Sequence, residues 1–399
     1  MEKNTPVGHI VGGGVMGLLA GLELEQLSRR LGLDIRLRLY EAQTFGGGLE
    51  ERTSAPRSQA WLHTDGQLYA QTQPTVCLSL QESTRRLRRL APEAFRYPPA
   101  FAVEILASAQ AEAPAAYRSL GVPHWRCSAD DLRRWFPSLR LPSGTELYRV
   151  RDATIDLAIL SALRVQRLRR ADVSLTLQGV QRLGLKGGRV RYLICDNGER
   201  ALLGEEDFVI LACGASIRPL LAGAGVTIEG LRVFRSHLIC SDAPRIPALV
   251  AVLKGGLTCV PHCDDEGRLL NIFGNSARNE LPPEEDGKPV RANPRAIEEL
   301  RHESEDWFQT PIPADALLGW AGVKTEIVGS GVRSQSSHAF RINGLENCWA
   351  AVPGKLSQTP ACGLELSRHI LRQRLGAGRA RSIWEGNPEI PSRVTAAAG

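Results

Sequence analysis

The hydrophobic and polar positions near the start of the chain follow first a strand pattern and then a helix pattern. Residues 7–11 form a short apolar run, which is typical of a buried parallel strand. A glycine-rich turn follows it, and leucines then recur at helical spacing at positions 18, 19, 22, 24 and 27. A second strand is expected over residues 35–41. The pattern therefore predicts a β-α-β unit.

Farther along, the chain alternates between the two periods. We expect helices over residues 76–93, near 129–136, over 155–171, near 294–307 and over 360–375. Strands are expected over residues 173–177, 190–195 and 208–212, and alternating strands and loops over 230–345. Residues 95–150 are otherwise rich in proline and aromatic residues, and the polar tail after residue 385 is expected to be loose.

This order of segments predicts how the domains are built. A simple NAD dehydrogenase completes its sheet with successive β-α units, whereas here the first unit is interrupted and resumes near residues 155–215. We predict an α/β (α+β) protein with a discontinuous Rossmann-type nucleotide-binding domain and an inserted β-rich substrate domain. The expected boundaries are 1–94, 151–229 and 346–385 for the first domain, 95–150 and 230–345 for the second, and 386–399 for the tail.

The turn between the first strand and the first helix has the spacing G-x-G-x-x-G, at Gly12, Gly14 and Gly17. The first glycine permits a tight turn, the second lets the backbone approach a pyrophosphate, and the third lets the helix pack closely on the strand. Glu41 ends the second strand, where an acidic side chain accepts hydrogen bonds from ribose hydroxyls. In a turn that binds no ligand, the glycines would cost backbone entropy on folding, and no binding interaction would offset that cost. The turn by itself does not separate NAD from FAD.

Composition places the chain among ordinary globular proteins. It has 399 residues, of which 43% are hydrophobic and 23% charged. No apolar run approaches the length of a membrane span. Because the strand that precedes the glycine turn starts within the first ten residues, we expect no signal peptide and a cytoplasmic location.

Charge and cysteine usage exclude other classes of partner. The net charge is +6, and the arginines of 85–89 and 164–170 are expected on solvated helix faces with few aromatic residues between them, so we expect no nucleic-acid partner. A mildly basic surface suits an anionic substrate. The nine cysteines form no C-x-x-C pair, and Cys259 and Cys263 lack the spacing of a metal site, so no metal is expected.

Further stretches complete a combination that is specific in its order. With the glycine turn and Glu41, the chain resembles the FAD-dependent oxidoreductases of the D-amino-acid oxidase superfamily along nearly its full length. Within it, the chain looks most like the branch of L-2-hydroxyglutarate and glycerol-3-phosphate dehydrogenases. The stretches that carry the resemblance are residues 52–63 (RTSAPRSQAWLH), 211–215 (LACGA), 320–324 (WAGVK) and 353–360 (PGKLSQTP). This resemblance decides for FAD over NAD.

The resemblance implies which residues hold the cofactor. The loop after Glu41 would pass the pyrophosphate and the isoalloxazine, and the loop at 354–359 would present N–H groups near flavin O2, where negative charge develops on reduction. The expected cofactor-binding residues are Gly12, Gly14, Val15, Met16, Gly17, Glu41, Thr53, Ser54, Ser58, Ala212, Gly214, Gly354, Lys355, Leu356 and Ser357.

Two departures from the branch lie where substrate and flavin would meet. The branch usually has His-Ala-Gly or His-Gly-Gly, whereas this chain has His63-Thr-Asp-Gly, one residue longer. That spacing looks like relatives of dimethylglycine dehydrogenase, in which the histidine is bonded to the flavin. The chain also has Lys324 where relatives often have arginine.

These departures leave several roles open. His63 is expected to be a catalytic base, a covalent link to the flavin or an ordinary loop histidine. Lys324 is expected to pair with a substrate carboxylate or phosphate, or to be a surface lysine beside Glu326. Lys355 is expected near flavin O2 or the substrate anion, and Tyr69 and Arg333 are further candidates for substrate binding.

The resemblance implies an oxidoreductase that passes a hydride from a small anionic substrate to flavin N5. A CH–OH donor of the 2-hydroxy-acid type is the first expectation. An amine or amino-acid oxidase is the alternative, because a neutral amine loses hydride without a strong base. A flavin-binding subunit of a complex is a third hypothesis. The electron acceptor, oxygen or a quinone, stays open.

Overall fold

The computed structural model describes most of the chain, and for residues 332–333 it describes the backbone alone. The described residues are 5–45, 58–97, 102–106, 113–140, 145–243, 245–252, 256–263, 267–286, 290–309, 311–313, 317–329, 332–333 and 336–375.

A six-stranded sheet forms the centre of the first half of the molecule. Its strand order is β20-β21-β12-β1-β2-β8, with β20 antiparallel to β21 and the other neighbours parallel. The strands are β1 (Val7–Val11), β2 (Arg36–Tyr40), β8 (Ser174–Thr176), β12 (Phe208–Leu211), β20 (His338–Arg341) and β21 (Cys348–Val352). Because these strands come from distant parts of the sequence, the predicted discontinuous Rossmann-type fold is confirmed.

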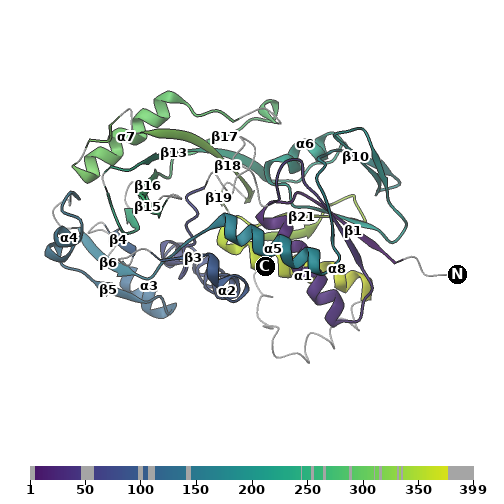
Figure 1. The fold of residues 1–399 in the computed structure, drawn as a ribbon, viewed down its shortest axis with the longest axis horizontal. Helices are drawn as coiled ribbons and strands as arrows, with labels where there is room; N and C mark the ends of the chain where they lie inside the picture. The colour runs from purple at the N-terminus through teal and green to yellow at the C-terminus, as the bar shows by residue number, and fades with distance from the viewer. Residues whose placement is uncertain are drawn as a thin grey trace.

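Helices cover one face of this sheet and a smaller sheet covers the other, as Figure 1 shows. On one face lie α1 (Val15–Arg30), α5 (Leu157–Arg170) and α8 (Thr359–Leu375), and α2 (Pro74–Leu90) packs against α8. On the other face lie α6 (Ile217–Ala222) and the antiparallel strands β9 (Val180–Lys186), β10 (Arg189–Cys195) and β11 (Arg200–Leu202). Both faces are apolar, as expected of a buried parallel sheet.

A ten-stranded sheet forms the second half, with the order β19-β18-β13-β16-β15-β14-β4-β6-β5 and β17 paired to β13. Its long strands β13 (Leu231–Ser241) and β18 (Leu318–Gly329) run antiparallel side by side, and α7 (Pro294–Phe308) covers the sheet in Figure 1. The remaining strands are β4 (Ala102–Leu106), β5 (His124–Arg126), β6 (Glu146–Val150), β14 (Val250–Val252), β15 (Thr258–Cys263), β16 (Leu269–Gly274), β17 (Asn279–Glu280) and β19 (Val332–Arg333). This sheet is the predicted β-rich insertion.

Residues 95–150 contain more regular structure than the sequence predicts. The expected helix is present as α4 (Ala129–Trp135), whose first turn is capped by Ser128 and Asp131. The segment also contains α3 (Ala113–Ser119), the strands β4 to β6, and β3 (Phe95–Arg96), which pairs with β7 (Thr154–Ile155). The apolar pattern does not predict β4, because Glu104 interrupts its apolar run, although the Glu104 side chain is fully buried.

The predicted domain boundaries stay a prediction. β20 falls in the range assigned to the substrate domain, yet it pairs with β21 in the six-stranded sheet.

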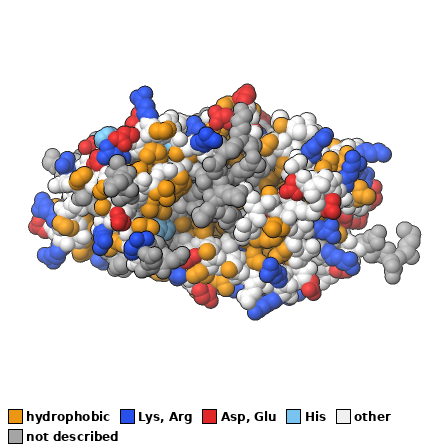
Figure 2. Space-filling view, turned by 45° about the horizontal axis from the view of Figure 1, so that its top comes forward, with side chains coloured by type: hydrophobic (Ala, Val, Ile, Leu, Met, Phe, Trp, Pro, Cys, Tyr) orange, Lys and Arg blue, Asp and Glu red, His pale blue; other side chains and the backbone are white. Residues whose placement is uncertain are grey.

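Figure 2 shows basic and acidic side chains interspersed on one face of the molecule. Among the described helices, none is both long enough and apolar enough to span a bilayer.

Candidate functional site

A cavity of about 520 Å³ opens where the six-stranded sheet meets the long strands β13 and β18. Gly12, Glu41, Ala212 and Pro353 each follow directly after a strand of the parallel sheet, and all four line the cavity. In open α/β sheets, ligands bind in this crevice at the carboxyl ends of the strands. The fold therefore places the candidate site where the glycine turn predicts it.

The glycine turn has the geometry that a dinucleotide requires. Gly12 has φ +103°, a conformation that favours glycine. A Cβ on Gly17 would lie 1.7 Å from the carbonyl oxygen of Gly12, so α1 crosses the turn too closely for any side chain. A Cβ on Gly14 would meet no atom within 4 Å, because this residue faces the open cavity. Backbone and helix N-terminus are thus free to approach a pyrophosphate.

Glu41 lies beside this turn and is nearly buried. Its Oε2 accepts a hydrogen bond from the N–H of Gly13 at 2.7 Å, and its Oε1 accepts one from the N–H of Gln43 at 3.0 Å. Each carboxylate oxygen can accept a second bond. Glu41 is therefore held in place with acceptor capacity left for ribose hydroxyls.

The other expected cofactor residues fall into three groups. Those that line the cavity with the turn and Glu41 are Val15, Met16, Ser58, Ala212, Gly214, Gly354, Lys355 and Leu356. Gly17 and Ser357 lie outside the lining, Gly17 because it packs on the turn and Ser357 because its side chain is fully buried. Thr53 and Ser54 lie outside the described residues. The donor groups and the open space at Gly14 fit FAD, which these residues would hold.

His63 lines the cavity in the segment that follows Ser58. Its ring is 3.9 Å from the ring of Trp61, centroid to centroid, and 5.8 Å from that of Tyr69. Its Nδ1 atom is buried and has no hydrogen-bond partner among the residues that the structure describes. His63 is also one of the few non-glycine residues described with a positive φ, at +52°. The imidazole is thus held between aromatic rings with a free polar atom.

The surroundings of His63 disfavour its protonation. Burial is the largest cause that lowers its pKa well below the ordinary value, and the positive charges of Lys355, Lys324 and Arg278 lower it further. The imidazole is therefore neutral at neutral pH. Because burial and the nearby cations disfavour the protonated imidazole, His63 is a weak proton acceptor.

Two cations that line the cavity share one buried carboxylate. Lys324 Nζ lies 2.6 Å from Oε1 of Glu326, and Nη1 of Arg278 lies 3.2 Å from the same atom. Glu326 is fully buried, while Lys324 and Arg278 are partly exposed and line the cavity. Lys324 is thus partly exposed beside Glu326 and brings a positive charge to the lining of the cavity.

Lys355 brings a third positive charge from the loop before α8. Its Nζ lies 5.2 Å from the centre of the Tyr69 ring, a cation–π distance. Tyr69 itself lies outside the lining, beneath Lys355 and against His63. The side chain of Arg333 lies outside the described residues. The structure therefore brings His63, Lys324 and Lys355 together, as the sequence predicts.

Three residues near His63 were not predicted from the sequence. Arg278 follows β16 with no motif around it. Trp61 lies within the stretch that carries the family resemblance, but nothing local assigns it a role. Asp152 is buried behind the His63 segment and bonds to it from a distant part of the chain. Their positions depend on contacts between distant segments, which leave no local pattern.

No carboxylate of the described lining is among the charges that shift the pKa of His63. Among the described residues of the lining, the acidic ones are Glu41 and Asp196. Asp196 accepts a hydrogen bond from the N–H of Gly179 at 2.9 Å, beside the nucleotide turn. The surroundings of His63 are thus cationic and aromatic, and they suit a small anionic ligand.

Comparison with known proteins agrees with this geometry. A family model described as DAO, FAD dependent oxidoreductase, matches residues 9–368. Among solved structures, glycine oxidase from Geobacillus kaustophilus is similar at 18% identity and a TM-score of 0.66, over 92% of this chain and 95% of that one. No curated protein sequence matches the chain.

Two further structures are similar over most of their lengths. NikD, an unusual amino acid oxidase essential for nikkomycin biosynthesis, has 16% identity and a TM-score of 0.70, over 92% of this chain and 95% of that one. Iminodiacetate oxidase from Chelativorans sp. BNC1 has 16% identity and a TM-score of 0.66, over 91% and 95%. At these identities the likeness shows a shared fold.

Proposed function

The chain belongs to the DAO family of FAD-dependent oxidoreductases, and from this premise we propose that it oxidises the CH–NH group of a small amino acid. This substrate class replaces the 2-hydroxy acid that the sequence put first. The single observation that carries the proposal is the buried His63 with three cations of the cavity lining acting on it, which lower the pKa of its imidazole further after burial. The branch of hydroxyglutarate and glycerol-3-phosphate dehydrogenases stays a prediction.

The compared structures support an amine donor. Their names are those of a glycine oxidase, an amino acid oxidase and an iminodiacetate oxidase. An L-proline dehydrogenase from P.horikoshii is also similar, at 14% identity and a TM-score of 0.67 over 94% of this chain and 95% of that one. These names favour a CH–NH donor over a CH–OH donor.

The chemistry of the cavity supports the same choice. Oxidation of a hydroxyl group needs a base that takes the O–H proton as the hydride leaves. His63 is a weak base here, and no carboxylate of the described lining is among the charges that shift its pKa. A neutral amine needs no such base, because its nitrogen lone pair forms the C=N bond as the hydride leaves.

The same positive charges prepare the amine. An amino acid in water carries an ammonium group, which must lose a proton before hydride transfer. Lys324, Lys355 and Arg278, whose charges lower the pKa of His63, would also lower the pKa of an ammonium group beside it. The site thus favours the neutral, reactive form of the bound amine.

Each side chain has a distinct part in this account. Lys324, with Arg278 beside it, holds the substrate carboxylate as a charge-assisted pair. Trp61 and His63 form the wall against which the substrate lies, so that its Cα–H is directed at the cofactor. Bound FAD supplies the two-electron acceptor that takes the hydride at N5. The loop at 353–356 also lines the cavity.

Product analysis tests the proposal. Holoenzyme is incubated with individual amino acids and an artificial electron acceptor, so that the result does not depend on whether oxygen or a quinone is the natural acceptor. We expect a 2-oxo acid together with ammonia or an amine, which water releases from the imine. Formation of a 2-oxo acid from the matching 2-hydroxy acids, with no product from the amino acids, would restore the first expectation.

The attachment of FAD is a separate question. A covalent bond to His63 stays a prediction, and acid precipitation of the holoenzyme tests it. Flavin colour in the supernatant means non-covalent FAD, whereas colour in the pellet that disappears in His63→Asn means attachment through His63.

A further inference from the structure

We propose that Asp152 is a positioning residue, whose carboxylate holds the segment of residues 59–67 and thereby fixes the imidazole of His63 in the cavity. This positioning role rests on the proposed function only for the part that His63 has there, as a wall against which the substrate lies. Asp152 follows β6 of the ten-stranded sheet and lies outside the lining of the cavity. It therefore acts through His63 and not on the substrate.

The contacts of Asp152 are concentrated on the His63 segment. Its Oδ1 accepts a hydrogen bond from the N–H of Thr64, the residue after His63, at 2.8 Å, and a second bond from its neighbour Ala153. Its Oδ2 accepts hydrogen bonds from Nε1 of Trp61 and from Nε2 of Gln67. All four partners are donors, and only a carboxylate has acceptors for all of them. The side chain is 2% exposed, so water does not compete for these bonds.

The backbone of the segment needs such a restraint. Ala60 and His63 both have positive φ values, +49° and +52°, which non-glycine residues rarely adopt and which store strain. The N–H of Leu62 donates to the carbonyl of Ala153, and the N–H of Ile155 donates to the carbonyl of Ala60. The strained conformation is thus maintained by the chain around Asp152.

Asp152 also fixes the ring on which His63 lies. The Nε1–H group of Trp61 donates a hydrogen bond to the carboxylate of Asp152. The same indole packs against the imidazole of His63, with the ring centroids 3.9 Å apart. Rotation of the indole would remove that support. Asp152 therefore acts on His63 along two routes, through the backbone at Thr64 and through the ring of Trp61.

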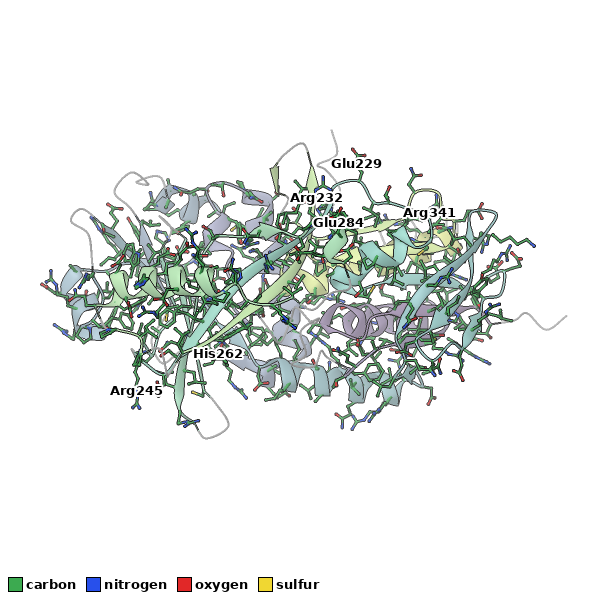
Figure 3. All side chains as sticks on the ribbon, turned by 90° about the horizontal axis from the view of Figure 1, so that it is seen from above. Glu229, Arg232, Arg245, His262, Glu284 and Arg341 are labelled. Atoms are coloured by element: carbon green, nitrogen blue, oxygen red, sulfur yellow. The ribbon has the colours of Figure 1, made fainter. Side chains whose placement is uncertain are left out.

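A second anchor lies at the start of the same segment. The side chain of Gln59 donates to Thr258 Oγ1 at 2.9 Å and to the carbonyl of Ile272 at 3.1 Å. Nε2 of His262, a residue labelled in Figure 3, donates to the carbonyl of Gln59 at 2.9 Å. The inserted sheet thus holds both ends of the segment, and Asp152 is the anchor adjacent to His63.

Histidine NMR tests the proposal without any substrate. Protein labelled at histidine Cε1 is titrated with and without FAD, and the His63 resonance is assigned by its absence in His63→Asn. In Asp152→Asn, we expect the His63 resonance to shift and broaden and its pKa to move toward the ordinary value, because an amide puts an N–H group against donors and releases the ring. An unchanged His63 resonance in folded Asp152→Asn would overturn the proposal.

A matched control separates positioning from general loss of a buried carboxyl group. Glu104 is 1% exposed on β4, and burial, followed by the charge of Asp152, raises its pKa to about 8. Glu104→Gln is expected to leave the His63 resonance unchanged. An equal change in both variants would contradict a specific role of Asp152.

A double-mutant cycle gives the second readout. If Asp152 acts through His63, Asp152→Asn raises KM several-fold in the wild-type background and has no further effect in His63→Asn. Additive effects on KM would overturn the proposal.

If Asp152→Asn fails to fold, Gln67→Met removes one donor and keeps the carboxylate, and the same shift of the His63 resonance is expected on a smaller scale. A shifted resonance in a protein that oxidises no amino acid would contradict the proposed function and leave the positioning role standing.

Discussion

The ammonium of Lys324 lies 2.6 Å from the carboxylate of Glu326, two residues farther along the same strand. Residues two apart on a strand point to the same face. Glu326 is fully buried and also pairs with Arg278. One carboxylate thus holds two cations at the edge of the cavity and limits the freedom of both before any substrate binds.

Replacing Lys324 tests whether this arrangement binds the substrate carboxylate. We expect Lys324→Met to raise KM by roughly 10- to 100-fold, since a hydrogen bond to a charged group contributes about 1.5–3 kcal/mol. Steady-state kinetics with the best amino acid measures this. Lys186→Met, at an exposed lysine of β9, is the control for loss of one positive charge and is expected to leave KM unchanged. Equal KM values in both variants would remove Lys324 from the site.

The two glycines of the turn are expected to respond differently to a side chain. Gly14→Val adds its side chain to open cavity, so the apoprotein should keep its melting temperature while FAD affinity falls at least about tenfold, or 1.4 kcal/mol. Gly17→Ala places its Cβ on the carbonyl of Gly12 and should destabilise the apoprotein as well. Calorimetry of FAD binding and thermal unfolding distinguish them. Normal FAD binding by Gly14→Val would place the pyrophosphate elsewhere.

His63 is expected to contribute less than a general base would. With an amino acid as substrate, we expect His63→Asn to lower kcat by less than about tenfold, whereas loss of a general base costs roughly 10²–10⁴-fold. The pKa of His63 is lowered well below its ordinary value, so the imidazole stays neutral as pH rises from 6 to 8. The pH profile of flavin reduction should therefore show no ionisation of His63 in that range. A loss of 1,000-fold or more, together with the loss of an ionisation, would identify His63 as the base.

Arg164 offers a prediction on stability away from the site. Contrary to the solvated face expected for residues 164–170, it is 2% exposed on α5, and its guanidinium has no hydrogen-bond partner within the part of the chain that the structure describes. Burial lowers its pKa to about 9, although Glu23 on α1 partly opposes this. We expect Arg164→Met to leave the free energy of unfolding unchanged or to raise it by about 1 kcal/mol or more, because replacing buried charge by a well-packed apolar side chain is often neutral or stabilising.

Chemical denaturation measures this difference. Arg169→Met, at an exposed position of the same helix, controls for helix propensity and is expected to change little. A loss of several kcal/mol in Arg164→Met alone would mean that the buried guanidinium has a stabilising partner.

Sequence patterns predict the parts of this fold that local spacing determines. The strand, turn and helix from Val7 to Arg30 follow from apolar periodicity and three glycines, and the helices expected later are present as α2, α4, α5, α7 and α8. β4 was missed because its pairing partners, β14 and β6, determine its burial, and Glu104 breaks the apolar run. The sequence carries no local signal for pairing of that kind.

The candidate site divides in the same way. Residues that directly follow strands, such as Glu41 and Ala212, were predicted because motif and strand end coincide. Arg278 and Asp152 were not predicted, because each acts through a distant partner: the bond from Thr64 to Asp152 spans 88 positions. The proposed substrate class differs from the one that the sequence put first, because the pKa of His63 depends on cations that only the fold brings near it.

Anaerobic reduction of the bound flavin tests the central claim most directly. Holoenzyme is mixed, without any acceptor, with an amino acid or with the 2-hydroxy acid of the same side chain, in both enantiomers, and the flavin absorbance is followed. We predict that at least one amino acid bleaches the flavin and that its hydroxy-acid counterpart does not. Bleaching by hydroxy acids alone would contradict the account and assign the protein to CH–OH oxidation.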